Sequence, residues 1–100
     1  MFDKMKELYQ LQKKARAIQK ELRNTEIEAT ALDDKIKIVF NGEQKIQSLK
    51  IEESLLNSSQ KNNLEKGLLN AIREGIARSQ QIAAEKMKDV AGDLNIPGLN

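Results

Sequence analysis

The chain has 100 residues, of which three are aromatic and none is Cys or His, and its formal net charge is +2. This length allows one domain with a small core, and the lack of Cys and His excludes disulfides, Cys-containing zinc sites, Cys nucleophiles and the usual serine triad. No apolar run is long enough to span a membrane and the N-terminus lacks the apolar core of a signal peptide, so we expect a cytoplasmic protein.

The first predicted element is an amphipathic helix over residues 3–23, a stretch without Gly or Pro. Apolar side chains recur in it at spacings of three and four residues and form a narrow seam suited to packing against another helix. This seam consists of Leu8, Leu11, Ala15, Ile18 and Leu22. Basic side chains recur on the opposite side, at Lys13, Arg16, Lys20 and Arg23, with Lys6 beside them.

Positive charge is concentrated in this first helix, because residues 1–24 carry seven Lys and Arg against three Asp and Glu. Such an asymmetry suggests an anionic partner. The spacing alone favours a solvated basic face over a nucleic-acid site, since four or five basic residues without interleaved aromatic residues occur on many helices. A membrane-surface helix is less favoured still, because the seam carries no Trp or Phe apart from Phe2 at its end.

Alternation and β-branched residues then predict three antiparallel strands over residues 25–32, 35–41 and 45–51. Asp33-Asp34 forms the first predicted turn, and Asn41-Gly42 indicates a hairpin because both residue types tolerate positive φ. Ile46 is out of phase with Leu49 and Ile51 in the third strand. A bulge near Glu43-Gln44, or a sheet buried on both faces, would explain this mismatch.

A second long helix is predicted over residues 60–91, with Ser58 or Ser59 as its N-cap. Gly67 and Gly75 weaken this helix, so we expect them to permit close packing against a sheet or another helix. Gly92 is placed to end it. The sequence thus predicts a single α+β domain over residues 1–91, composed of a helix, a three-stranded antiparallel meander and a long helix, followed by a flexible tail over 92–100.

No constellation of catalytic residues is found. The carboxylate pairs Asp33-Asp34 and Glu52-Glu53 lie at a predicted turn and a predicted strand end, and neighbours in a strand point to opposite faces. The glycines form neither a P-loop nor a dinucleotide-binding fingerprint. We therefore expect no enzyme, and no metal, cofactor or small-molecule substrate.

The order of these elements and several short segments resemble the YbaB/EbfC family of small bacterial nucleoid-associated proteins. The segments are residues 37–42, 48–52 before Leu55-Leu56, 70–74, 85–87 and 96–99. The resemblance covers nearly the whole chain and implies a homodimer with a shared central body, projecting helices, and DNA binding at the nucleoid without catalysis. The chain departs from the family at Leu32-Asp33-Asp34, where many members have a Gly-rich turn.

With this resemblance added, the basic side of the first helix becomes the predicted site for duplex DNA, bound mainly through its phosphates. The predicted DNA-binding residues are Lys6, Lys13, Lys14, Arg16, Lys20 and Arg23. A second location for the site is the later helix, at Arg73, Arg78, Lys86 and Lys88. The alternative function is a protein–protein adaptor for replication or recombination factors, in which the basic helix is only a solvated surface.

An obligate homodimer is also expected, because the core is small and the strands carry too many apolar residues for one covered face. The predicted shared residues are Ile36, Ile38, Phe40, Ile46, Leu49, Leu68 and Ile72.

Overall fold

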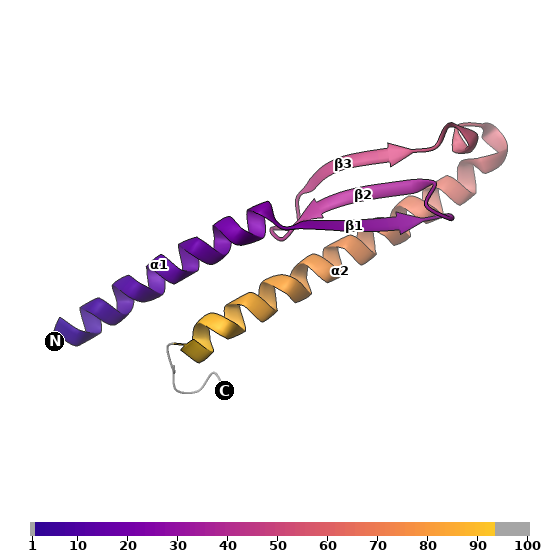
Figure 1. The fold of residues 1–100 in the computed structure, drawn as a ribbon. Helices are drawn as coiled ribbons and strands as arrows, with labels where there is room; N and C mark the ends of the chain where they lie inside the picture. Colours follow the sequence, from indigo (N-terminus) through magenta and orange to yellow (C-terminus); the bar gives the residue numbers. More distant parts are fainter. Residues whose placement is uncertain (1, 94–100) are drawn as a thin grey trace.

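The fold is a long helix, a three-stranded antiparallel meander and a longer helix (Figure 1). The computed structural model describes residues 2–93. Its elements are α1 (Phe2–Asn24), β1 (Glu26–Ala31), β2 (Ile36–Asn41), β3 (Ile46–Ile51), two 3₁₀ turns (Glu53–Leu55 and Ser58–Gln60) and α2 (Lys61–Asp93). The predicted α+β class and element order are confirmed. Helix α2 runs through Gly92 to Asp93, and residues 94–100 of the predicted tail lie outside the described residues.

The sheet has the order β1-β2-β3, and a β-bulge in β3 resolves the phase mismatch of Ile46. Val39 pairs with Ser48 and Phe40 pairs with Ile46, so Gln47 is an extra residue. The bulge thus lies inside β3 and not at Glu43-Gln44, where it was expected. Because directly opposed residues share a face, Ile46 joins the side of the sheet that carries Phe40.

The β2–β3 hairpin forms at the predicted place for a different reason. Its positive φ of 67° falls on Gln44, and neither Asn41 nor Gly42 adopts the left-handed region. Gly42 is required by a close approach instead, since a Cβ there would lie 2.8 Å from both the Cδ2 and the carbonyl oxygen of Leu22. The hairpin therefore supports the end of α1 directly.

The β1–β2 turn holds three consecutive left-handed residues, none of them Gly. Leu32, Asp33 and Asp34 have φ of 53°, 55° and 65°. A Cβ is unfavourable in this region, although Asp tolerates it better than most residues. These three residues therefore store backbone strain at this end of the sheet.

We expect Asp34→Gly to raise the free energy of unfolding by about 0.5 to 1 kcal/mol, because Gly adopts this φ without a Cβ penalty. Asp34→Ala keeps the Cβ and loses the short polar side chain, so it should destabilise the fold. Urea denaturation followed by circular dichroism measures both. Equal stabilities of the two variants would contradict strain at this turn.

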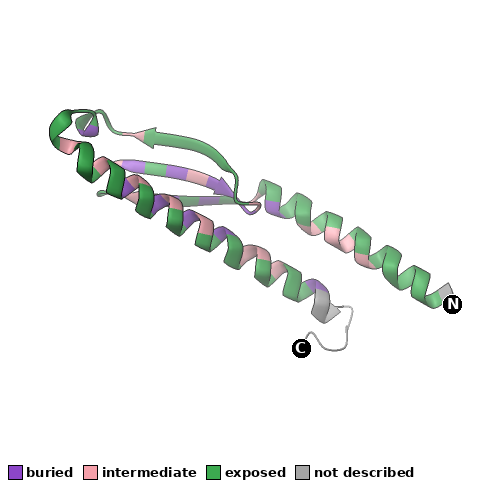
Figure 2. Cartoon of the chain, turned by 180° about the vertical axis from the view of Figure 1, so that it is seen from behind, coloured by how far each residue is buried: buried purple, intermediate pink, exposed green. Residues whose placement is uncertain are grey.

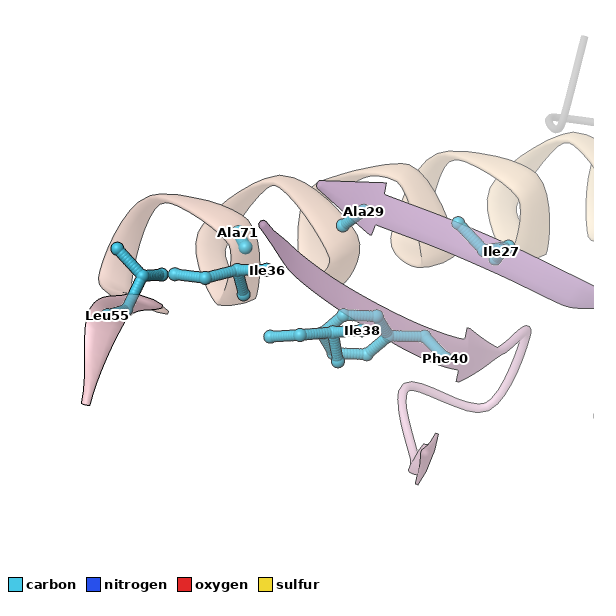
Figure 3. Close-up of a cluster of buried hydrophobic side chains, with 7 residues drawn as sticks. All are labelled: Ile27, Ala29, Ile36, Ile38, Phe40, Leu55 and Ala71. Atoms are coloured by element: carbon cyan, nitrogen blue, oxygen red, sulfur yellow. The ribbon is translucent and has the colours of Figure 1, made fainter. Parts of the chain in front are cut away.

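The core lies between one face of the sheet and α2 (Figure 3). It is formed by Ile27, Ala29, Ile36, Ile38, Phe40, Leu55 and Ala71. Gly67 and Gly75 let α2 approach this face, as expected, since a Cβ on Gly75 would lie only 2.0 Å from Cε2 of Phe40. Most of β3 stays exposed, as do most residues of α1 (Figure 2).

The predicted N-cap residues Ser58 and Ser59 lie inside a 3₁₀ turn that precedes α2, and Asn57 caps this turn. The side chain of Asn57, not that of Ser58 or Ser59, accepts a hydrogen bond from the backbone N–H of Gln60 at 3.1 Å. This cap closes the 3₁₀ turn that leads into α2 at Lys61.

The molecule is strongly elongated, with principal extents of 67 × 22 × 15 Å. Its radius of gyration is 19.0 Å, against about 13 Å for a compact domain of 100 residues. The length comes from α1, which projects away from the sheet beside the C-terminal part of α2 (Figure 1). This projecting helix carries the predicted DNA site.

Candidate nucleic-acid interface

The outer side of α1 carries an exposed row of basic side chains, which we call the cationic stripe. Lys6, Lys13, Arg16, Lys20 and Arg23 make up the stripe and are all exposed. Lys14, also predicted to bind DNA, is half-buried and falls on a different side of α1, the side that carries Glu7 and Glu21. At 1.5 Å per residue the stripe extends over about 25 Å of helix. The structure therefore places the predicted residues along one projecting element.

Acidic side chains are separated from the cationic stripe. At 100° per residue, Asp3, Glu7 and Glu21 fall on another side of α1, next to the apolar seam. Attraction within the helix therefore does not neutralise most of the stripe, and its potential extends into solvent.

Packing of the apolar seam decreases steadily toward the free end of α1. Leu22 at the base is only 6% exposed, Ile18 and Ala15 are half-buried, and Leu8 is 62% exposed. The last turn of α1, around Leu22, is thus part of the folded body, and the rest of α1 projects from it as an arm.

The base of this arm is anchored by the β2–β3 hairpin. The backbone N–H of Gly42 donates to the Leu22 carbonyl at 2.7 Å. The Thr25 hydroxyl donates to the Glu21 carbonyl at 2.7 Å, which satisfies an end carbonyl of α1. Arg23 at the inner end of the stripe pairs with Glu43 at 3.1 Å. These contacts fix the direction in which the arm leaves the sheet.

The hairpin is in turn attached to α2 through a buried hydroxyl. The Ser79 side chain, fully buried, donates to the Asn41 carbonyl at 2.9 Å and accepts from the Gln44 N–H at 3.0 Å. The Asn41 side chain accepts from the N–H groups of Glu43 and Lys45. The turn therefore links α1, the sheet and α2 in one rigid joint.

A second contact joins the two helices near the base of the arm. Lys86 of α2 pairs with Glu21 of α1 at 2.6 Å. The hydrogen bond and the charge of the Glu21 carboxylate raise the pKa of Lys86, which stays protonated at neutral pH. This cation is therefore engaged within the protomer.

The basic residues of α2 do not form a comparable row. Arg73, Arg78, Lys86 and Lys88 are spaced by five, eight and two residues, which distributes them around the helix. Arg78 also donates to the Glu28 carbonyl and pairs with Glu74 at 3.8 Å. The geometry favours α1 over α2 as the site.

The residues predicted at the dimer interface fall into two groups. Ile36, Ile38 and Phe40 are at most 1% exposed beneath α2, which leaves them no surface for a second chain. Ile46 and Leu49 are 53% and 51% exposed on β3. Leu68 and Ile72 are half-buried on α2. The strand β3 and the neighbouring flank of α2 are thus the available apolar surface.

The sequence analysis did not identify Tyr9 as a member of the cationic stripe. Tyr9 lies three residues after Lys6 and four before Lys13, so it continues the spacing of the stripe, and it is 67% exposed. The expectation that no aromatic residue is interleaved with the basic residues is therefore wrong. The same three-and-four spacing that located the lysines would have located Tyr9.

Two absences apply to residues 2–93. No group of three acidic side chains in this range is placed to hold a metal ion. No helix in the same range has the length and apolar character needed to cross a membrane.

Comparison with known proteins places this arrangement in a family. A sequence model described as the YbaB/EbfC DNA-binding family matches residues 1–94. A nucleoid-associated protein of Syntrophobacter fumaroxidans is 34% identical over 98% of this chain and 89% of its own, and one of Clostridium kluyveri is 35% identical over 95% and 83%. The crystal structure of an uncharacterized protein, HP0035 from Helicobacter pylori, has the same fold, with a TM-score of 0.70, 20% identity and 89% coverage of both chains.

The matched family model and these relatives define a class of small DNA-binding, nucleoid-associated proteins. The chain belongs to the YbaB/EbfC DNA-binding family.

Proposed function

We propose that this protein binds duplex DNA at the nucleoid as a homodimer, mainly through contacts from the cationic stripe to phosphates. The observation that carries the proposal is a row of exposed basic residues on one side of a projecting helix, in which Lys6, Lys13, Arg16 and Lys20 lie beyond the ion pair that Arg23 makes with Glu43. Family membership and the names of the relatives support DNA as the partner. No catalytic step belongs to this function.

Phosphate contacts dominate in this proposal because all the charged members of the stripe are Lys and Arg, the side chains that neutralise phosphates. Each phosphate contact releases counterions, so the logarithm of the affinity falls by about 0.9 per contact against the logarithm of the salt concentration. Two arms making six contacts would lose roughly a thousandfold in affinity between 50 and 200 mM salt.

The test is a binding titration at 50 and 200 mM salt with labelled duplexes, some of random sequence and some selected for binding to the protein. Steeply salt-dependent binding to all duplexes supports the proposal. The adaptor alternative predicts weak binding to DNA together with protein partners that remain bound after nuclease treatment. Absence of salt-dependent DNA binding would overturn the DNA-binding function.

We infer the homodimer from an apolar surface that a single protomer leaves exposed to solvent. Ile46 and Leu49 of β3 lie on the α2 side of the sheet, yet α2 covers only β1 and β2. A copy related by twofold symmetry would bury β3 of each chain against the same surface of the other and complete both cores.

We expect Leu49→Lys to convert the dimer to a monomer, because two unpaired ammonium groups would be buried at a twofold interface. Light scattering should give about 11.3 kDa for this variant and twice that mass for the wild type. Ser48→Lys, on the neighbouring position and the other face of β3, is the matched control and should stay dimeric. A wild-type monomer at micromolar concentration would refute the dimer.

A further inference from the structure

Tyr9 combines features that point to a role in binding. It lies within the cationic stripe, between Lys6 and Lys13 on the same side of α1. Its ring is 67% exposed, whereas Phe40, also aromatic, is fully buried in the core. The side chain is therefore an aromatic group presented to the solvent among cations.

The surroundings of Tyr9 give its ring space for a ligand. Two open hollows on the surface of α1 share Tyr9 and Gln10 in their walls, and they are completed by Lys13 on one side and by Lys6 on the other. Met5, next to the ring, is 70% exposed. The apolar part of a ligand that enters either hollow contacts the ring. A negatively charged part of the same ligand then lies beside a lysine.

We propose that Tyr9 presses its ring against the sugars and base edges of duplex DNA, between phosphates held by Lys6 and Lys13. This inference rests on the proposed function. The two lysines are seven positions apart, which is about 10.5 Å along the helix axis and close to the roughly 12 Å width of the major groove. A residue between two phosphate-binding lysines therefore faces the groove.

The ring contributes differently from the lysines. It is neutral, so its contact with DNA releases no counterions and leaves the salt slope unchanged. A contact between the ring and the sugars is tolerant of sequence, because the same deoxyribose borders every base pair. Tyr9 thus adds a part of the affinity that persists at high salt.

The chain itself offers a probe, since Tyr9 is its single tyrosine and there is no tryptophan. Tyrosine emission of the wild type, followed while unlabelled duplex is added, should change in parallel with binding of a labelled duplex measured by anisotropy. Emission that stays constant while anisotropy reports saturation would overturn the contact.

Three variants complete the test. Tyr9→Ala should weaken binding about fivefold to tenfold at both 50 and 200 mM salt with the same slope, and Tyr9→Phe should stay within about twofold of the wild type. Leu8→Ala, the neighbouring residue with 62% exposure on the seam side, is the matched control and should also stay within about twofold. Circular dichroism and light scattering confirm that each variant keeps its helix content and assembly.

The outcomes separate this inference from the proposed function. A wild type that binds no labelled duplex overturns both. Normal binding by Tyr9→Ala leaves the DNA-binding function intact and overturns the role of Tyr9. A loss in Tyr9→Phe as large as in Tyr9→Ala, or an equal loss in Leu8→Ala, overturns the ring contact, because the hydroxyl or a general apolar effect would then be responsible.

Discussion

Replacing Lys13, Arg16 and Lys20 with Gln should lower the affinity for every duplex by at least about a hundredfold at 50 mM salt. The three side chains are exposed at the centre of the cationic stripe, and a homodimer loses six of them. If each contacts one phosphate, the salt slope flattens by about 5. Fluorescence anisotropy with labelled duplexes at several salt concentrations measures both quantities.

A control with the same change in net charge is available on the body of the protein. Lys50, Lys61 and Lys66 are exposed and lie away from α1, so their replacement with Gln should leave the slope nearly unchanged. Both triple variants should keep the fold and the mass of the wild type. An unchanged affinity and slope in the arm variant would move the DNA site to Arg73, Arg78, Lys86 and Lys88 of α2.

Gly75→Ala should remove most of the stability of the protein. The added Cβ would lie 2.0, 2.3 and 2.5 Å from three ring carbons of Phe40, which is fully buried. A close-packed core cannot accept this overlap without moving the ring or lifting α2 from the sheet. We expect a loss of about 3 kcal/mol or more in the free energy of unfolding, although Ala favours a helix over Gly by about 1 kcal/mol.

Gly67→Ala is the matched control for this prediction. Its Cβ would meet Cδ1 of Ile36 at 2.9 Å and Cδ1 and Cγ of Leu32 at 3.0 and 3.1 Å, which are milder overlaps with aliphatic side chains, so we expect a change within about 1 kcal/mol. Adding Phe40→Leu to Gly75→Ala should recover part of the loss, because the smaller side chain makes room. Urea denaturation measures the free energy of unfolding of the wild type and of these three variants. Equal stabilities of Gly75→Ala and Gly67→Ala would contradict the packing of Phe40 against Gly75.

The fold could be predicted from local patterns because each element has a clear period. The spacing from Leu8 to Leu22 located α1, and alternation through Ile36 and Phe40 located β2. The bulge at Gln47 could not be predicted in position, because it depends on how two strands pair. Gly42 was expected because Gly tolerates positive φ. It is needed instead because a Cβ would overlap Leu22, and a contact with a residue twenty positions away does not show in a local sequence pattern.

The candidate site could be predicted where its residues depend on one element alone. Helical spacing was enough to find the cationic stripe, since it depends on one element alone. Three apolar strand residues assigned to a dimer interface, Ile36, Ile38 and Phe40, lie in the protomer core. A pattern of alternation shows that a face is buried, but it does not show whether the covering element is the chain's own helix or a partner's.

The graded burial of the seam, from Leu22 at 6% exposure to Leu8 at 62%, has a consequence for the energetics of the arm. The outer half of α1 gains little from packing, and an isolated helix of about a dozen residues is only marginally stable in water. Its amides therefore open locally far more often than those of α2 against the sheet. A duplex that meets the outer lysines only in the helical state shifts this local equilibrium, so that helix formation is coupled to binding. Helix propensity at uncharged positions of the outer half thus becomes a determinant of affinity for DNA.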